Sequence, residues 1–349
     1  MLDNLHRFSP YKALMWADRI EAILKGGELP PPVIAHIYPT NVCGAECFWC
    51  IMEDEKKNHP GHIDTRLLAD TLTEIAEWGV KCVHFSGGGE PTMHPDLVTF
   101  LETAHSVGLD VAISSNLQKK SSPLDAMLEN CDHIRISMNA ADPDTYATEM
   151  GVPGKLFDQV VDNVSALVAK RKLHGHKVDI GIAMVMNPEN ATSVYDFCAM
   201  GANLGVDFVH VRPEFTYEGP RGREVRAVVH TAFELAKRAK EEFGNVVKIF
   251  AMSDKFQGYW MGHGYEVCHA NLMNLVIGAD ATLRICQDVL EPNFGDLKTT
   301  PLKEIWQSDK HREVIGAIDL KKCPRCVLEN ANEIIQRVFI DDEMRRFLL

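Results

Sequence analysis

Short apolar runs alternate with longer amphipathic stretches through the first two thirds of this 349-residue chain. Short runs of this kind predict buried strands, and apolar residues at helical spacing predict helices. The predicted strands lie at 33–38, 80–85, 110–114, 133–138, 178–186 and 206–212. The predicted helices lie at 65–77, 95–107, 124–129, 156–174, 191–204 and 224–243. Repeated strand-then-helix units favour parallel strands in a barrel-like α/β sheet.

Different patterns flank this alternation. Apolar residues at helical spacing predict a helix over 9–25, which Gly26 and Gly27 end. Beyond residue 250 the alternation stops, and 275–286 is typical of a β-hairpin with its turn near 279–282. A final helix is predicted within 331–349. The chain thus divides into an N-terminal helix and linker (1–32), a barrel (33–245), a smaller unit (246–330) and a C-terminal helix (331–349).

Composition and charge exclude several classes of protein. The chain is 46% hydrophobic and 24% charged, as is usual for a soluble globular protein. No apolar run reaches a membrane-spanning length, and the N-terminus lacks the pattern of a signal peptide. A net charge of −13 argues against a nucleic-acid surface and offers no attraction to anionic membranes. The chain has ten cysteines, and some of them cluster as C-x3-C-x2-C and C-x2-C without a secretion signal. This clustering favours metal chemistry in a reducing compartment, so we expect a cytoplasmic protein.

Three cysteines follow the first predicted strand, at Cys43, Cys47 and Cys50. Three thiolates on one loop can ligate three irons of a [4Fe–4S] cluster and leave the fourth iron open to a ligand. A zinc site or idle buried thiols are the alternatives. A structural zinc site needs four ligands, and the nearest further Cys or His is His59, nine residues on. The spacing therefore favours a cluster.

A glycine-rich turn, Ser86-Gly87-Gly88-Gly89-Glu90-Pro91, directly follows the second predicted strand. Glycines let the backbone approach a ligand closely, and a carboxylate such as Glu90 can pair with an ammonium group. Taken alone, the stretch is equally typical of an ordinary strand-to-helix turn.

The C-x3-C-x2-C loop and the Gly-Gly-Glu turn, in this order, resemble the signature of the radical S-adenosylmethionine (SAM) superfamily. The resemblance implies a partial (β/α)6 barrel of TIM type, with its active site at the carboxyl ends of the strands. It also implies that the open iron binds SAM and that an electron cleaves the S–C5′ bond. The resulting 5′-deoxyadenosyl radical would then remove hydrogen from a substrate.

Several residues match positions that serve SAM in this family. The resemblance implies that Gly88, Gly89 and Glu90 hold its amino group and that Trp49 lies against its adenine. It places Ser115, Asn116 and Ser137 near the methionyl and ribose groups. Each of these polar residues is also compatible with ordinary turn chemistry. Asn139 stands where the family more often has Asp, so we assign it no role.

Arg212 ends the sixth predicted strand. It is a candidate for bidentate binding of a SAM or substrate carboxylate, with a surface ion pair as the alternative.

A second cysteine set, Cys268, Cys286, Cys323 and Cys326, supplies four soft ligands, enough to close a metal site. The region resembles the twitch extension, a shortened SPASM domain, and the resemblance implies one auxiliary [4Fe–4S] cluster. A zinc knuckle is the alternative. Ala281 stands where the family usually has Gly.

The remaining cysteines, Cys82, Cys131 and Cys198, are typical of small buried hydrophobes. The alternative is that one of them donates a hydrogen atom, as radical epimerases require.

The resemblance implies a radical SAM oxidoreductase acting on a small polar molecule such as a sugar or aminocyclitol, by oxidation to a ketone or by epimerisation. Its expected electron donor is a flavodoxin or ferredoxin-type protein. The alternative is modification of a ribosomally made peptide, although the 42 residues before Cys43 leave no room for a peptide-recognition domain. Nucleic-acid modification and a non-catalytic iron–sulfur protein are less favoured, because the chain shows no basic patch and the second role needs no Gly-Gly-Glu turn.

Overall fold

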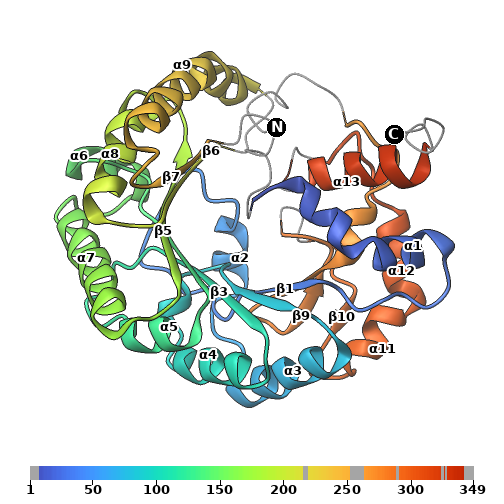
Figure 1. Cartoon of the computed structure of the whole chain (residues 1–349). Coiled ribbons are helices and arrows are strands. Elements are labelled where there is room, and N and C mark those ends of the chain that lie inside the picture. The colour runs from blue at the N-terminus through green and yellow to red at the C-terminus, as the bar shows by residue number, and fades with distance from the viewer. Residues whose placement is uncertain are drawn as a thin grey trace.

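The computed structural model describes residues 8–214, 219–251, 263–287, 291–323, 326 and 328–341. Within them, ten strands form one sheet in the order β10-β9-β8-β1-β2-β3-β4-β5-β6-β7. Figure 1 shows this curved sheet as an inner layer with helices on its outside. The strands are β1 (Ile34–Ile37), β2 (Cys82–Phe85), β3 (Asp110–Ser115), β4 (His133–Ser137), β5 (Asp179–Met186), β6 (Phe208–Pro213), β7 (Lys248–Ala251), β8 (Asn274–Ile277), β9 (Thr282–Arg284) and β10 (Gly295–Asp296).

Strands β1 to β7 pair in parallel, each with the next, because a helix connects most successive strands across the outer face. The predicted partial barrel is confirmed. The helices are α1 (Ala17–Lys25), α2 (Glu53–Asn58), α3 (Thr65–Trp78), α4 (Leu97–Ser106), α5 (Leu124–Asn130), α6 (Pro143–Met150), α7 (Leu156–His174), α8 (Val194–Leu204), α9 (Gly219–Phe243), α11 (Leu302–Gln307), α12 (Asp309–Gly316) and α13 (Glu329–Ile335).

Helix α3 illustrates how local sequence sets these elements. The Asp64 carboxylate caps its first turn by accepting a hydrogen bond from the Leu67 amide at 2.8 Å. Gly79 ends the helix with φ +105°, a conformation that strains any residue with a Cβ. The apolar stripe between these caps, including Leu68, Leu72 and Ile75, is fully buried against the sheet.

The two faces of each strand differ in chemistry. Alternate side chains such as Ile37, Val83, Phe85 and Ile113 are fully buried, and they pack in the main core with the helices. The intervening residues face the inside of the barrel, and many of them are polar. This polar interior opens at the carboxyl ends of the strands and positions the candidate site.

The sheet continues beyond the six predicted strands. Strand β7 pairs in parallel with β6, and β8 pairs in parallel with β1 on the opposite side. The sequence pattern did not predict β7, because this strand is only four residues long. It predicted β8 as part of a hairpin, but not its pairing with β1. One continuous sheet runs through both the 33–245 and 246–330 units, so the division between them stays a prediction.

The predicted hairpin is present. Strands β8 and β9 are antiparallel, and the Gly278 amide donates to the Thr282 carbonyl at 2.9 Å. Ala281 has φ +68° in this turn. This left-handed backbone explains why glycine suits the position where this chain has alanine.

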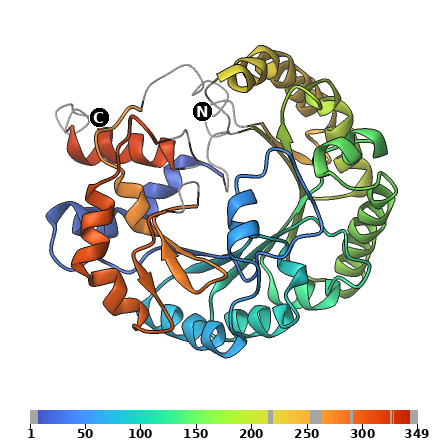
Figure 2. The ribbon, with the colours of Figure 1, turned by 180° about the vertical axis from the view of Figure 1, so that it is seen from behind.

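The two ends of the described chain lie together. Helix α1 follows a short 3-10 helix (Pro10–Trp16), and both lie beside α13 in Figures 1 and 2. Ile20 and Ile23 of α1 join Met273 and Ile335 in a second small core. Only the first part of the predicted 331–349 helix is described, as the end of α13 and a π-helical turn (Gln336–Ile340); residues 342–349 lie outside the described residues.

A buried arginine joins the hairpin to helix α2. The Arg284 side chain is 1% exposed and pairs with Glu55 at 3.2 Å, with Asp280 at 2.9 Å and with Glu291. Because α2 follows the cysteine loop and Arg284 lies two residues before Cys286, this cluster of charges links the two cysteine regions.

We expect Arg284→Met to lower the free energy of unfolding by about 3 kcal/mol, since it removes the buried guanidinium that pairs with three carboxylates, two of which are largely withdrawn from water. Urea unfolding monitored by circular dichroism measures this loss. Arg66→Met is the matched control, because the Arg66 side chain is 92% exposed. Equal stability of the two variants would contradict the prediction.

Candidate active site

The loop after β1 places the three clustered cysteines at the carboxyl edge of the sheet. Cys43, Cys47 and Cys50 are each partly exposed and line one cavity of about 440 Å³. The Cys47 Sγ lies 3.8 Å from the Met150 Sδ, and the Glu46 amide donates to the Met150 carbonyl at 2.9 Å. The end of helix α6 therefore holds one side of the cysteine loop.

The three thiols also act on one another. Burial raises the pKa of Cys47 to about 12, and the neighbouring Cys50 and Cys43 thiols add to the shift. Burial is likewise the main cause that raises the pKa of Cys43. Thiols in this setting become thiolates when a metal binds them.

The glycine turn holds the other side of the cysteine loop. The Gly89 amide donates to the Thr40 carbonyl at 2.8 Å, and the Glu90 amide donates to the Val42 carbonyl at 2.9 Å. A Cβ on Gly88 would lie 1.8 Å from the Asn41 Oδ1. The glycines are thus required first for contact between the two motifs, which brings the turn and the cysteines to the same cavity.

Both carboxylate oxygens of Glu90 accept hydrogen bonds from other residues of the protein. Its Oε1 accepts hydrogen bonds from the Ser115 hydroxyl at 2.6 Å and from the Thr92 hydroxyl at 2.8 Å. Its Oε2 accepts from the Asn116 amide at 2.7 Å. Burial raises the pKa of Glu90, and these hydrogen bonds oppose that shift. The carboxylate therefore ties the ends of β2 and β3 together at the cavity wall.

The remaining predicted SAM residues also line this cavity. Ser137 ends β4 and Arg212 lies near the end of β6, and both face the same space as the cysteines. Asn139 has φ +62°, its Oδ1 accepts from the Val185 amide at 2.9 Å, and its amide nitrogen lies 3.2 Å from the Met150 Sδ. A short side chain that tolerates the left-handed region suits this turn, which gives Asn139 a structural role.

Trp49 is held by a buried acid that the sequence analysis did not single out. The Trp49 Nε1 donates to the Glu149 Oε2 at 2.8 Å, and the Asn187 amide nitrogen donates to the same oxygen at 2.8 Å. Glu149 is fully buried, and burial raises its pKa to about 7. No sequence motif marks it, because its partners lie 100 and 38 residues away.

Glu149 should make the stability of the protein depend on pH. Its pKa rises from 4.5 to about 7 on folding, so the native state keeps a proton that the unfolded chain releases. The resulting stability is present below about pH 4.5 and is lost as the pH rises through about 7, by up to roughly 3 kcal/mol. We expect Glu149→Gln to remove most of this decline.

Urea unfolding at about pH 5 and about pH 8 measures the effect. Glu102→Gln, at an exposed position of α4, is the control and should keep the decline of the native protein. An unchanged pH dependence in Glu149→Gln would show that Glu149 is not its source.

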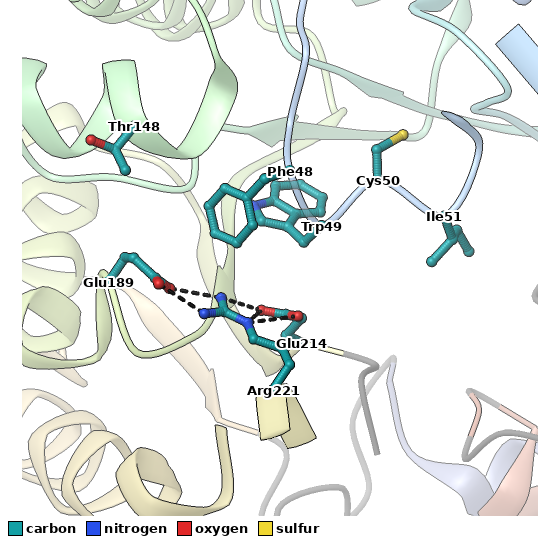
Figure 3. Close-up of a pocket in the computed structure, with 8 residues that line it drawn as sticks. All are labelled: Phe48, Trp49, Cys50, Ile51, Thr148, Glu189, Glu214 and Arg221. Atoms are coloured by element: carbon teal, nitrogen blue, oxygen red, sulfur yellow. Dashed lines mark hydrogen bonds and ion pairs between the residues drawn. The ribbon is translucent and has the colours of Figure 1, made fainter. Parts of the chain in front are cut away.

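An ion-paired cluster forms the rim beside the cysteine loop. Arg221 pairs with both Glu189 and Glu214 at 2.7 Å, and its guanidinium lies 5.0 Å from the Phe48 ring centroid. Figure 3 shows Arg221 between the two carboxylates, with Phe48 and Trp49 alongside them. These residues line a second, adjoining cavity of about 520 Å³.

Histidines occupy the barrel interior below the cysteine loop. The His36 Nδ1 lies 3.3 Å from the His84 Nδ1, and the His84 Nε2 lies 2.8 Å from the Ser114 hydroxyl. Burial lowers the pKa of His36 to about 4 and holds that of His84 well below its usual value. Both imidazoles are therefore neutral at physiological pH. The strand pattern showed only that these residues alternate with apolar ones.

Three of the four predicted auxiliary cysteines gather around Tyr265. Burial raises the pKa of Tyr265, as do the nearby charges of Glu329, Cys326, Cys268 and Cys323. The fourth, Cys286, lies two residues beyond the end of β9.

The C-terminal helix packs against this auxiliary region. The Asn332 side chain of α13 donates to the Cys268 Sγ at 3.3 Å and accepts from the Ala270 amide at 2.8 Å. Helix α13 thus packs against Cys268, one of the predicted auxiliary cysteines.

The other three cysteines lie away from the cavity. Cys131 and Cys198 are buried, and burial raises the pKa of each, that of Cys198 to about 12. The Cys82 Sγ faces the Val33 carbonyl, and burial raises the pKa of Cys82 to about 11. Since none of the three lines the cavity, they behave as small hydrophobic residues.

The donor sets fit iron–sulfur clusters. Three thiols share a cavity wall with a turn of glycines, and a second thiol set is gathered around Tyr265. In the described part of the chain, no three His, Cys, Asp or Glu side chains lie close enough together to chelate one metal ion.

Comparison with known protein families agrees with this geometry. The profile of the radical SAM superfamily matches residues 37–199, and that of the SPASM iron–sulfur cluster-binding domain matches residues 268–327. The chain belongs to the radical SAM superfamily and has a C-terminal region of SPASM type. Membership implies a SAM-binding [4Fe–4S] cluster, auxiliary iron–sulfur binding and SAM as cofactors. The predicted resemblance is confirmed.

Individual relatives differ in what their names describe. A probable GTP 3′,8-cyclase of Saccharolobus islandicus is 29% identical over 175 residues, covering 49% of this chain and 54% of that protein. The chain thus spans about half the length of such relatives. The PqqA peptide cyclase of Ruegeria pomeroyi is 26% identical over 300 residues, covering 80% of this chain and 76% of that protein.

Solved structures share the fold. SuiB of Streptococcus suis bound to its precursor peptide SuiA superimposes with a TM-score of 0.67 and 16% identity, covering 89% of this chain and 72% of SuiB. The AdoMet-bound structure of anSMEcpe gives a TM-score of 0.63 and 17% identity, covering 87% of this chain and 85% of that chain. Among the described residues, no helix combines the length and apolarity needed to span a bilayer.

Proposed function

We propose that this radical SAM enzyme removes a hydrogen atom from a small polar substrate, of sugar or aminocyclitol type, and oxidises it to a ketone. One observation supports this above all: the cysteine loop, the Gly88–Glu90 turn and the ends of β3, β4 and β6 line one cavity of about 440 Å³. A space of this size is typical of small-molecule sites.

We assign separate roles in cluster and SAM binding to the residues of the cavity. Cys43, Cys47 and Cys50 hold the catalytic cluster, and the Gly88–Glu90 backbone binds the SAM amino group. Ser115, Asn116 and Ser137 orient the methionyl and ribose groups, Trp49 supports the adenine, and Arg212 binds the carboxylate. When bound, these cofactors supply the electron that cleaves SAM and the 5′-deoxyadenosyl radical that removes hydrogen. Glu149 acts indirectly by fixing the Trp49 ring.

Oxidation is favoured over epimerisation. An epimerase needs a hydrogen-atom donor on the opposite face of the substrate, and Cys82, Cys131 and Cys198 all lie outside the cavity lining. In the oxidation, the carbinol carbon would lose a hydrogen atom to the radical, and its hydroxyl group would then release a proton as one electron leaves to form the C=O bond. The acceptor for this electron is one auxiliary cluster held by Cys268, Cys286, Cys323 and Cys326.

Modification of a ribosomally made peptide is the second candidate. The similarity to the PqqA peptide cyclase over 80% of this chain favours it. The open rim around Phe48 and Arg221 adjoins the active-site cavity and offers room for a longer substrate. For either substrate, we assign a flavodoxin or ferredoxin-type electron donor and a cytoplasmic location.

Metal analysis and SAM cleavage test the proposal together. Iron, sulfide and zinc content and EPR spectra are measured on anaerobically reconstituted protein and on the Cys43/Cys47/Cys50 triple alanine variant. We expect cleavage of SAM by the native protein, and about four irons per chain in the variant. If the variant keeps only zinc, or no metal, the protein has no auxiliary cluster to accept the electron, and this result contradicts the proposed oxidation. If the enzyme converts a short peptide but no sugar, peptide modification would replace sugar oxidation as the proposed function.

A further inference from the structure

More basic than acidic side chains line the active-site cavity. Lys56, Arg135 and Arg212 line it, together with two acids, Glu90 and Glu214. The two acids are already engaged, because Glu90 accepts four hydrogen bonds from nearby residues. Glu214 accepts from Arg221 with both oxygens, at 3.2 and 2.7 Å (Figure 3). Both acids thus have partners among the described residues other than Arg135.

Arg135 differs from the other cations in its surroundings. It lies inside the barrel on β4, two residues before Ser137, and is only partly exposed. It makes no hydrogen bond or ion pair with any residue that the structure describes. Burial and, to a smaller extent, the nearby Arg212 guanidinium lower its pKa to about 10, so the group stays charged at neutral pH. A guanidinium withdrawn from water without a partner is costly, and this cost points to a ligand.

The groups around Arg135 can form hydrogen bonds with a ligand and are uncharged. His36 and His84 line the same cavity with Ser114, and both imidazoles are neutral because their pKa values are low. The charge of Arg135 contributes to the lowering in both histidines, which places it close to them. A single guanidinium beside neutral imidazoles and a hydroxyl is suited to an oxyanion that is planar or tetrahedral.

We propose that Arg135 binds an oxyanion of the substrate, a carboxylate or a phosphate, on the floor of the cavity. This inference rests on the proposed function, in which Arg212 binds the carboxylate of SAM. It narrows the substrate class to acidic small molecules, such as a sugar acid or a sugar phosphate. It also assigns the substrate an orientation, with its anionic end inside the barrel and its reacting carbon toward the cysteine loop.

Calorimetric titration of the reconstituted, SAM-loaded protein tests the assignment. The probes are inorganic phosphate and acetate, without reductant, so that no turnover occurs. We expect saturable binding to the native protein and to Arg66→Gln, which removes an exposed guanidinium. Arg135→Gln should weaken binding at least about tenfold, and Arg135→Lys by a smaller factor, because a lysine keeps the charge but loses the bidentate geometry. The more tightly bound anion identifies the substrate as a phosphate ester or a carboxylic acid.

Three results would overturn the assignment: no saturable anion binding by the native protein, equal binding by Arg135→Gln, or a loss of SAM affinity in Arg135→Gln. The last result would mean that Arg135 serves SAM rather than the substrate. Iron content and thermal unfolding of each variant establish that it is folded. If Arg135→Gln does not fold, the test uses Arg135→Lys instead. Phosphate affinity of Arg135→Lys equal to that of the native protein would then overturn the proposal. SAM cleavage, measured on the same protein preparations after a reductant is added, separates failure of this inference from failure of the proposed function.

Discussion

Alanine at Cys43, Cys47 or Cys50 is expected to abolish SAM cleavage while the fold persists. Each thiolate holds a different iron of the cluster, so the loss of one leaves the cluster incomplete. We expect cleavage to fall at least about a thousandfold, equivalent to roughly 4 kcal/mol in the barrier. The three thiols lie on a partly exposed loop, so stability should change by less than about 1 kcal/mol. Production of 5′-deoxyadenosine under reducing conditions measures the first effect, and urea unfolding the second.

Cys198→Ala is the matched control, and it should show the opposite pattern. Its thiol is fully buried in the main core, away from the cavity. The variant should lose about 1 kcal/mol of stability and keep its SAM cleavage. Cleavage retained in all three loop variants would reject the assignment of the catalytic cluster.

Gly89→Ala is expected to separate the glycine turn from the cysteine loop. The added Cβ would lie 2.2 Å from the Val42 carbonyl oxygen and 2.6 Å from the Asn41 carbonyl carbon. These are backbone atoms, so the clash is relieved only by moving one loop and breaking the hydrogen bonds of Gly89 and Glu90 to it. We expect SAM affinity to fall at least about tenfold and the free energy of unfolding to fall by about 2–3 kcal/mol.

Titration of SAM into the reconstituted protein measures the affinity, and urea unfolding measures the stability. Gly316→Ala, at the end of α12, is the control, because a Cβ there would meet no atom within 4 Å. The control should change stability by less than about 1 kcal/mol and leave SAM affinity unchanged. Native SAM affinity in Gly89→Ala would mean that the two loops are independent.

The proposed substrate site depends on residues that no linear motif identifies. Arg135 and the pair of His36 and His84 occur within ordinary strand segments, alternating with apolar residues. Their shared direction into one cavity follows from the closure of the sheet, since a strand pattern does not tell an inner face from an outer one. Glu149 is a comparable case, because its contacts with Trp49 and Asn187 join distant parts of the chain.

The tertiary structure also changed the interpretation of residues that the sequence had identified. Glu90 was expected to pair with the SAM ammonium group, yet its carboxylate accepts hydrogen bonds from Ser115, Thr92 and Asn116. The glycines before it were expected to admit a ligand, and they also admit the cysteine loop. A motif shows that a residue type is required at a position, but the same residue type can be required for more than one physical reason.

The sequence by itself determined the strand-and-helix alternation, the two cysteine sets and the glycine turn, and hence the family. These features are local: they depend on hydrophobic period, on ligand spacing within one loop and on backbone freedom at single residues. Only the tertiary structure decided that β7 and β8 extend the sheet, that α13 packs against Cys268, and that the Arg135 guanidinium faces the cavity without a partner among the described residues. Those features arise from contacts between segments far apart in the chain, whose burial and pairing exist only once the barrel has closed.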